Sequence, residues 1–427
     1  MNRKKLKKEA CTKIDEYSDD ILKIVKKIYD NPETGYKENK TTEVIKKEFA
    51  KLNLETQNKI SITGIKAQAK GNSENPHLAI LGELDAVKCK EHPDADSETG
   101  AIHACGHNNQ IGIMLGVAYA LVKTNLITKL NGSIDFLAVP AEEYIELEYK
   151  EKLREQGKIK YFGGKQELIR RGYFDDIDLA IIPHSMDLGE MKDIIIGPQS
   201  EGFIRKKVRF IGDENLSEKI FEQEINALDA AVLAINGLST NRGSIVDKKN
   251  TRIYLNNEEL LKKSCSVIME TYVKGNTVKE LMSVNKIVNR RIKEAIQSIE
   301  VRAEINDTPG YLPLINYEGL MDILIDNLDG IISKEKMIKN ITLEGFFDSG
   351  DLSHMIPVLH PFFSGVKGRL HSNNFKTTDY DKAVITPAKV LTKTIIDILL
   401  GPKKRLKKLK TPFQNKEEYL TFLEEIS

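Results

Sequence analysis

Two potential metal ligands, Cys105 and His107, stand two residues apart in the segment His103-Ala104-Cys105-Gly106-His107-Asn108. A thiolate is a soft ligand and an imidazole a borderline one, so a Cys-x-His pair can hold one divalent transition metal ion from two sides. The pair directly precedes a helical pattern over 109–123, which places it at the start of a helix. Alone it is weak evidence, because a Cys-x-His pair more often reflects packing.

Further groups capable of metal binding or proton transfer follow along the chain. Glu142 and Glu143 end an apolar run, and adjacent carboxylates at such a point can divide labour, one holding metal while the other moves protons. His184 ends another apolar run, and His371 comes much later. A solvated acidic pair and hydrogen-bonded structural histidines are the plainer interpretations. Five potential ligands exceed the needs of one catalytic zinc ion and suit two metal ions: Cys105, His107, Glu143, His184 and His371.

Composition limits the function classes. The 427 residues predict two domains, and 64 basic against 63 acidic residues give no net field for binding nucleic acid or an anionic membrane. The four cysteines are too irregularly spaced for a disulfide framework, which favours a reducing compartment. No apolar core of signal-peptide length follows the basic N-terminus, and no apolar run approaches the length of a membrane span. We therefore expect a soluble, cytoplasmic protein.

The pattern of elements predicts an α/β fold with a mainly parallel mixed sheet flanked by helices. Apolar runs typical of buried strands occupy 77–84, 133–139 and 178–183, and helical spacing covers 13–52, with a break at Asn31-Pro32, and 109–123. Ligand-binding residues then belong at the carboxyl ends of the strands, where each candidate side chain stands. The stretch from Tyr144 to Tyr161, rich in Glu and Lys, is interpreted most simply as a solvated helix, although its position after Glu143 would let it shape a pocket.

The pattern changes after Pro198 and changes back after Pro309-Gly310. Predicted strands at 204–211, 251–255, 265–273 and 298–305, with helices at 221–238 and 277–297, follow the order of a ferredoxin-like domain. The second helix opens with the capping box Thr277-x-x-Glu280. We therefore expect 199–308 to be an inserted α+β lid or dimerisation domain between the two parts of a catalytic domain, 1–198 and 309–427. The tail, basic at Lys403–Lys410 and amphipathic at Glu417–Ile426, predicts a solvated helix pair, with a partner contact as the alternative.

At this point the motifs resemble a known family. Asp85, the His103–Asn108 segment, Pro140-Ala141-Glu142-Glu143, His184 and His371 stand in the order found in binuclear metallo-amidohydrolases of the aminoacylase, hippurate hydrolase and carboxypeptidase G type. The resemblance covers nearly the whole chain and implies a zinc-exopeptidase-like fold. The p-aminobenzoyl-glutamate hydrolase branch is the most similar, because Asn108 is usual there.

The resemblance implies roles for individual residues. Cys105, His107, Glu143, His184 and His371 would hold two divalent ions (zinc, manganese or cobalt), with Cys105 as a possible bridge. Glu142 would be the general base that takes a proton from the attacking water and returns it to the leaving amine, and Asp85 would orient His107. Residues expected to support the ligands or to contact substrate are His103, Asn108, Asp351 and His354. The implied substrate is a small amide, an N-acyl-amino acid, an aminobenzoyl-glutamate-like compound or a dipeptide, and the implied assembly is a homodimer through the inserted domain.

The inserted domain departs from the family pattern. Where the family has Gly-Lys-x-x-His-Ala, this chain has Gly212-Asp213-Glu214-Asn215-Leu216-Ser217, and 259–262 and Lys274 also differ. We therefore expect the usual contacts to the oxyanion and to the substrate carboxylate to be altered in this chain. A weakly active or non-hydrolytic metal-binding homologue is the main alternative, and a single structural zinc ion is a third. Glu142 argues against both, because such sites need no additional carboxylate beside the ligands.

Overall fold

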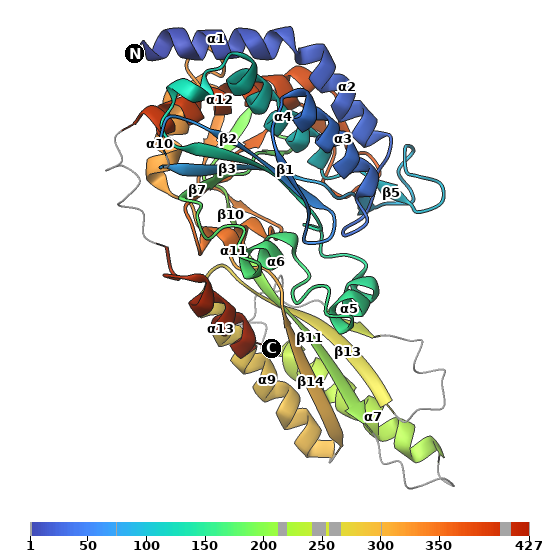
Figure 1. Ribbon diagram of the computed structural model, residues 1–427. Coiled ribbons are helices and arrows are strands. Elements are labelled where there is room, and N and C mark those ends of the chain that lie inside the picture. Colours follow the sequence, from blue (N-terminus) through green and yellow to red (C-terminus); the bar gives the residue numbers. More distant parts are fainter. Residues whose placement is uncertain are drawn as a thin grey trace. The chain divides into compact units, whose positions relative to one another are not determined.

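The computed structural model forms two compact units (Figure 1). The larger unit comprises Met1–Gln199, Ile315–Leu343 and Asp351–Lys416, and the smaller comprises Ser200–Leu314, Glu344–Gly350 and Glu417–Ser427. The structure describes residues 2–73, 75–211, 220–240, 253–255, 266–299, 301–401 and 411–426. Four features considered in the sequence lie outside these residues: 212–217, 259–262, Cys265 and 403–410.

A six-stranded mixed sheet forms the centre of the larger unit, in the order β1-β2-β6-β3-β7-β17. Strands β6, β3, β7 and β17 are mutually parallel, whereas β2 and β1 continue the sheet in antiparallel fashion. The strand bounds are β1 Thr56–Ile60, β2 Gly64–Lys70, β3 His77–Glu83, β6 Ser133–Val139, β7 Leu179–Ile181 and β17 Val358–Leu359. The prediction of a mainly parallel mixed sheet is confirmed, but the hairpin of β1 and β2 was missed.

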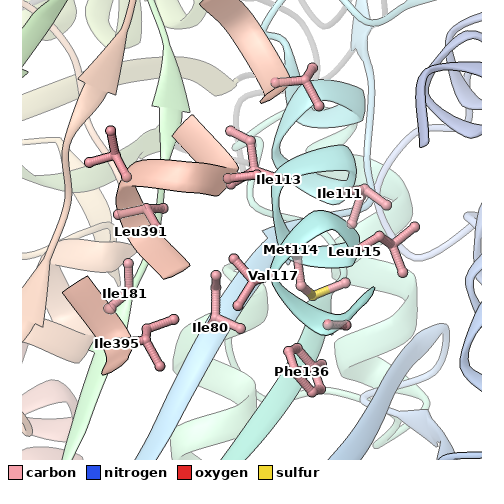
Figure 2. Packing of buried hydrophobic residues seen from close by; sticks show 14 of the residues in the cluster. Ile80, Ile111, Ile113, Met114, Leu115, Val117, Phe136, Ile181, Leu391 and Ile395 are labelled. Atoms are coloured by element: carbon pink, nitrogen blue, oxygen red, sulfur yellow. The ribbon is translucent and has the colours of Figure 1, made fainter. Parts of the chain in front are cut away.

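Helix α4, His107–Lys123, is buried along nearly its whole length. Its apolar side chains contact β3 on one side and the helices α2 (Ser18–Tyr29) and α12 (Thr386–Leu400) on others. Figure 2 shows Met114 and Val117 near Ile80 of β3 and Phe136 of β6. A helix that is apolar on all sides is stable only inside a core. The N-terminus of α4, which carries His107, is therefore held firmly.

The other helices of the larger unit cover this core. Figure 1 shows α1 (Arg3–Glu16), α2, α4 and α12 gathered against one another, and α3 (Asn39–Lys51) packs on β2. The break at Asn31-Pro32 is confirmed. Helix α1 begins before the predicted residue 13, since Leu6, Ala10 and Ile14 place one buried side chain on each turn.

A second, smaller sheet of the larger unit has the order β15-β9-β18-β8. Its strands are β8 His184–Ser185, β9 Ile194–Ile196, β15 Met337–Lys339 and β18 Phe362–Phe363. Further helices are α5 Leu147–Glu155, α6 Gly164–Arg170, α10 Glu318–Asp326 and α11 Ser349–Ser353. The expectation of a solvated helix within 144–161 is wrong in part, because α5 buries Lys150 and Leu153.

In the described part of the smaller unit, a four-stranded antiparallel sheet has two helices packed on it and on each other. The sheet order is β12-β13-β11-β14, with β11 Gly202–Ile211, β12 Ile253–Leu255, β13 Ser266–Gly275 and β14 Arg302–Pro309, and the helices are α7 Ile220–Thr240 and α9 Val278–Ile299. The predicted element order is correct. The last strand starts later than predicted because α9 continues to Ile299.

Two predictions concern helices in this part of the chain, the capping box at the start of α9 and the solvated helix near the C-terminus. Thr277 Oγ1 accepts a hydrogen bond from the Glu280 amide at 3.1 Å, as in a capping box, but the Glu280 carboxylate accepts from the Asn276 amide. Helix α13, Lys416–Ile426, buries Tyr419, Leu423 and Ile426, so it is not solvated on all sides. Across the described part of the chain, none of the helices is long and apolar enough to span a membrane.

Candidate metal centre

His107 is the first residue of α4, and the carboxyl end of β3 holds its ring. Gly106 before it adopts φ 79°, a left-handed conformation that glycine tolerates without cost. His107 Nδ1 lies 2.8 Å from the main-chain oxygen of Asp85 and 3.2 Å from Asp85 Oδ1. Because a carbonyl oxygen only accepts, the proton belongs on Nδ1 and Nε2 is directed at the centre as a potential ligand.

Cys105 lies at the junction of two groups of potential ligands. One atom each of Cys105, His107 and His184 lies within 4.8 Å of the others, and the same holds for Cys105, Glu143 and His371. Cys105 Sγ is 3.6 Å from His184 Nε2, while His184 Nδ1 is 2.9 Å from the Ser185 main-chain oxygen. The structure thus brings together all five ligands expected from the sequence.

The two adjacent glutamates follow β6 through a turn at Ala141, which has φ 53°. Two buried carboxylates fix this turn: the Ala141 amide donates to Glu38 Oε1 at 2.8 Å, and the Glu143 amide donates to Asp85 Oδ2 at 2.9 Å. Glu142 Oε2 and Glu143 Oε1 then lie 3.8 Å and 3.9 Å from His107 Nε2. Both carboxylates therefore point toward the same centre, as expected for a pair that divides labour.

His371 comes from the returning part of the chain. Its φ of 62° is uncommon for a residue with a side chain, and its amide donates to the Ala104 main-chain oxygen at 2.9 Å. His371 Nε2 is 3.0 Å from Glu143 Oε1, and its side chain is 50% exposed. It is thus the most solvent-accessible of the five potential ligands, whereas the other four are buried.

The charges at the centre support one another. Burial and the nearby Glu143 oppose ionisation of Cys105, but the imidazoles of His107, His371 and His184 outweigh them and lower the pKa of its thiol to about 6. Burial likewise disfavours the Glu143 carboxylate, yet His371 lowers its pKa to about 2. Glu143 in turn raises the pKa of His371 to about 12, against the effect of burial. Cys105 and Glu143 are therefore anionic beside a protonated His371, and His371 must release its proton when it binds a metal ion.

Two atoms test whether the centre fits metal ions. Among the described residues, His107 Nε2 and Glu143 Oε1 are buried and make no hydrogen bond of good geometry, although Glu83 Oε2 lies 3.1 Å from the first and His371 Nε2 lies 3.0 Å from the second. Buried polar atoms are rarely left so unless an ion or water belongs there. A thiolate, imidazoles and a carboxylate are ligands for zinc and similar transition metals. The residues present therefore fit two such ions.

The remaining sequence-predicted residues are also buried. Among the described residues, both ring nitrogens of His103 and both amide atoms of Asn108 have no hydrogen-bond partner. Burial, reinforced by His107, lowers the pKa of His103 to about 3. Asp351 accepts a hydrogen bond from Gln166 Nε2 at 3.2 Å, and the His354 ring packs 6.0 Å from that of Phe413. None of these four belongs to a cluster of potential ligands in the described chain.

Glu83 was missed in the sequence. Its Oε2 lies 3.1 Å from His107 Nε2, and it forms a third cluster with His107 and Glu142. Gln110 Nε2 donates to Glu83 Oε2 at 2.6 Å, and Lys165 Nζ, fully buried, pairs with Glu83 Oε1. The available signal was a single acidic residue at the end of an otherwise apolar strand. Glu38 gave no comparable signal, because it lies between helices in a polar stretch.

Comparison with protein-family models assigns the chain to a family. The model for peptidase family M20/M25/M40 matches residues 79–397, which include the five potential ligands. The chain belongs to this family. The resemblance inferred from the motifs is thereby confirmed.

Individual known proteins are similar to this chain to different extents. Thermostable carboxypeptidase 2 of Saccharolobus solfataricus is 32% identical over 175 residues, so the chain spans about 40% of the length of that relative. The N-acyl-L-amino acid amidohydrolase of Geobacillus stearothermophilus is 24% identical over 326 residues, covering 73% of this chain and 82% of the relative. The YXEP protein of Bacillus subtilis, described as a dinuclear metal-binding peptidase of the M20 family, shares the fold. Its TM-score is 0.69 at 17% identity, covering 90% of this chain and 99% of that one.

Proposed function

We propose that this protein is a metal-dependent amidohydrolase that cleaves the amide bond of an N-acyl-amino acid, an aminobenzoyl-glutamate-like compound or a dipeptide. The observation that carries the proposal is the position of Glu142, a carboxylate outside the five-ligand set but 3.8 Å from His107 Nε2. Membership of the M20 family and similarity to a carboxypeptidase and an N-acyl-amino acid amidohydrolase support it.

In this proposal, Cys105, His107 and His184 hold one divalent ion, and Cys105, Glu143 and His371 hold the other. Two bound ions supply Lewis acidity, which polarises the amide carbonyl and brings the pKa of water near neutrality. The two ions can be zinc, manganese or cobalt. Thiolate and imidazole ligands suit zinc and cobalt, and the carboxylate ligand also suits manganese.

Glu142 moves the proton. Its carboxylate takes a proton from water as the water oxygen bonds to the amide carbon, and returns that proton to the amine as the carbon–nitrogen bond breaks. Asp85 fixes the proton of His107 on Nδ1 and, through Oδ2, holds the amide of Glu143. Glu38 holds the amide of Ala141, so the backbone beside the base is fixed on both sides.

The arrangement of domains extends the proposal. We propose that 199–308 is the surface of a homodimer, with a lid over the site as the alternative role, and that the protein works in the cytoplasm on small amides. The stretch 212–217, which has no histidine, lies outside the described residues. If substrate contacts fail there, the alternative is a weakly active or non-hydrolytic metal-binding homologue.

The deciding experiment combines metal analysis with catalysis. The purified protein is loaded with zinc, manganese or cobalt, its metal content is measured by mass spectrometry, and amine release is followed on a panel of acyl-amino acids and dipeptides. Two metal ions per chain with metal-dependent amine release are expected. Two ions without turnover on any compound favour the non-hydrolytic alternative, and no binding after reconstitution overturns the metal centre.

A further inference from the structure

We propose that Lys150, on α5, is a positioning residue that sets the place of Glu143 and Glu142 through the main chain. The inference rests on the proposed metal centre, because Lys150 would position a potential metal ligand, Glu143, and the proposed base beside it, Glu142. It assigns to the segment 144–163 a part in holding the site, whereas the sequence of 144–161 predicted most simply a solvated helix, with a part in shaping the pocket as the alternative.

Lys150 is buried to an unusual degree for a lysine, with 1% of it exposed. Its Nζ donates to the main-chain oxygen of Glu143 at 2.6 Å and to that of Phe162 at 3.2 Å. It also lies 5.7 Å from the centre of the Tyr36 ring. One amino group thus joins the chain just after the base to the far end of the segment that follows.

The segment has a core of its own around this contact. Leu153, Ile159 and Phe162 pack in one buried cluster with Tyr36 and Ala141. Ala141 is the residue whose left-handed conformation turns the chain toward Glu142. The apolar cluster therefore packs against the turn at Ala141. The Lys150 amino group holds the end of this same turn through its hydrogen bond to the Glu143 carbonyl.

A second polar link ties the segment to the chain near the ligands. Glu146 pairs with Lys37 at 2.9 Å and with Lys88 at 2.7 Å, and it also accepts a hydrogen bond from Thr34. Lys88 follows Asp85 closely, and Thr34 and Lys37 flank Tyr36. Segment 144–163 is therefore attached to the rest of the larger unit at several points and is not an exposed helix.

The physical consequence concerns the Glu143 carbonyl. The chain leaves sheet geometry after β6, so this oxygen has no ladder partner, and it accepts instead from the nearby Ile145 amide at 2.9 Å and from Lys150 Nζ. The Lys150 bond ties the peptide plane after Glu143 to α5, while Asp85 fixes the amide before it. With both planes fixed, the Glu143 carboxylate is directed at the centre before any metal binds. Outer partners of metal ligands typically change metal affinity by about 10–100-fold when removed.

The first test is the variant Lys150→Met, which keeps the length and the apolar stem of the side chain but removes the donor. Lys152→Met is the matched control, since Lys152 lies on the same helix and is exposed. The dissociation constant for Zn²⁺ is measured by competition with a chelator, and Co²⁺ absorption reports the geometry of the bound ion. We expect affinity about 10–100-fold weaker and an altered Co²⁺ spectrum in Lys150→Met, with both unchanged in the control.

The second test uses the unaltered protein, so it does not depend on a variant that folds. Coupling between two sites is reciprocal. If Lys150 couples α5 to Glu143, Zn²⁺ binding must therefore slow hydrogen exchange at the amides of α5, even though α5 contributes no potential ligand. Unchanged exchange in α5 together with protection around Cys105 and Glu143 overturns the inference. So does a folded Lys150→Met variant with the affinity of the unaltered protein. Failure of the metal centre itself gives a different result, namely no Zn²⁺ binding by the unaltered protein.

Discussion

Asp85 Oδ2 accepts the amide of Glu143 at 2.9 Å while Asp85 Oδ1 lies 3.2 Å from His107 Nδ1. One fully buried carboxylate therefore contacts two potential ligands from different parts of the chain. In Asp85→Asn one of these oxygens becomes a donor, which faces either the Glu143 amide or the protonated His107 Nδ1.

We expect Asp85→Asn to weaken Zn²⁺ binding by about 10–100-fold, because both ligands lose a fixed orientation. The measurement is chelator competition monitored at equilibrium. Asp176→Asn, at an exposed position, is the control. Equal affinity of Asp85→Asn and the unaltered protein would show that the ligands hold their places without this carboxylate.

Glu142→Gln separates proton transfer from metal binding. Glutamine keeps the shape of the side chain but cannot take a proton, so kcat should fall by about 10²–10⁴-fold or more. Metal content should remain at two ions per chain, since Glu142 is outside the five-ligand set. Turnover and metal analysis on the same preparation test both statements, with Glu155→Gln, exposed on α5, as control. Retained turnover means that another group is the base.

Lys165 and Glu83 form a buried ion pair, with 0% and 3% of their side chains exposed. In Lys165→Met the Glu83 carboxylate remains buried and keeps its hydrogen bond from Gln110. Breaking such a pair from one side typically lowers the free energy of unfolding by about 3–5 kcal/mol. Urea unfolding of Lys165→Met, Glu83→Gln and the double variant gives the coupling energy of the pair. The double variant should be more stable than the sum of the single effects predicts, and additive effects contradict the pairing.

The sequence could group the potential ligands because they follow a topological rule. Polar residues that end buried parallel strands meet at one edge of the sheet, so the positions of Asp85, Glu143 and His184 along the chain are enough to group them. Glu83 was overlooked because it lies inside the strand pattern, and the charge that most offsets its buried carboxylate is that of Lys165 beside it. That partner is far away in sequence, and periodicity carries no information about it.

Lys150 illustrates the same limit. Glu and Lys at helical spacing normally indicate a solvated face, and most of α5 fits that pattern. Lys150 is the exception, because its amino group donates a hydrogen bond to the Glu143 carbonyl after the chain leaves β6. The hairpin of β1 and β2 was missed for another reason. Strand β2 alternates buried and polar residues, but two of its three buried alternating side chains are alanines, which are depleted in strands, and the edge strand β1 is mostly exposed and polar.

The ion pairs of Glu146 predict a specific dependence on pH. Burial disfavours the carboxylate, but Lys88, Thr34 and Lys37 lower the pKa of Glu146 from 4.5 to about 2. A group whose pKa is lowered by folding stabilises the folded state above its unfolded pKa, and this contribution is lost as the pH falls toward the folded pKa. Glu146→Gln should therefore be less stable than the unaltered protein by about 1–2 kcal/mol at pH 7, a range typical of two partly exposed pairs. The difference should shrink as the pH falls from about 4.5 toward 2. Urea unfolding of both proteins across this range is the measurement, with Glu155→Gln as control, and a difference that stays constant with pH means that Glu146 is not held by these charges.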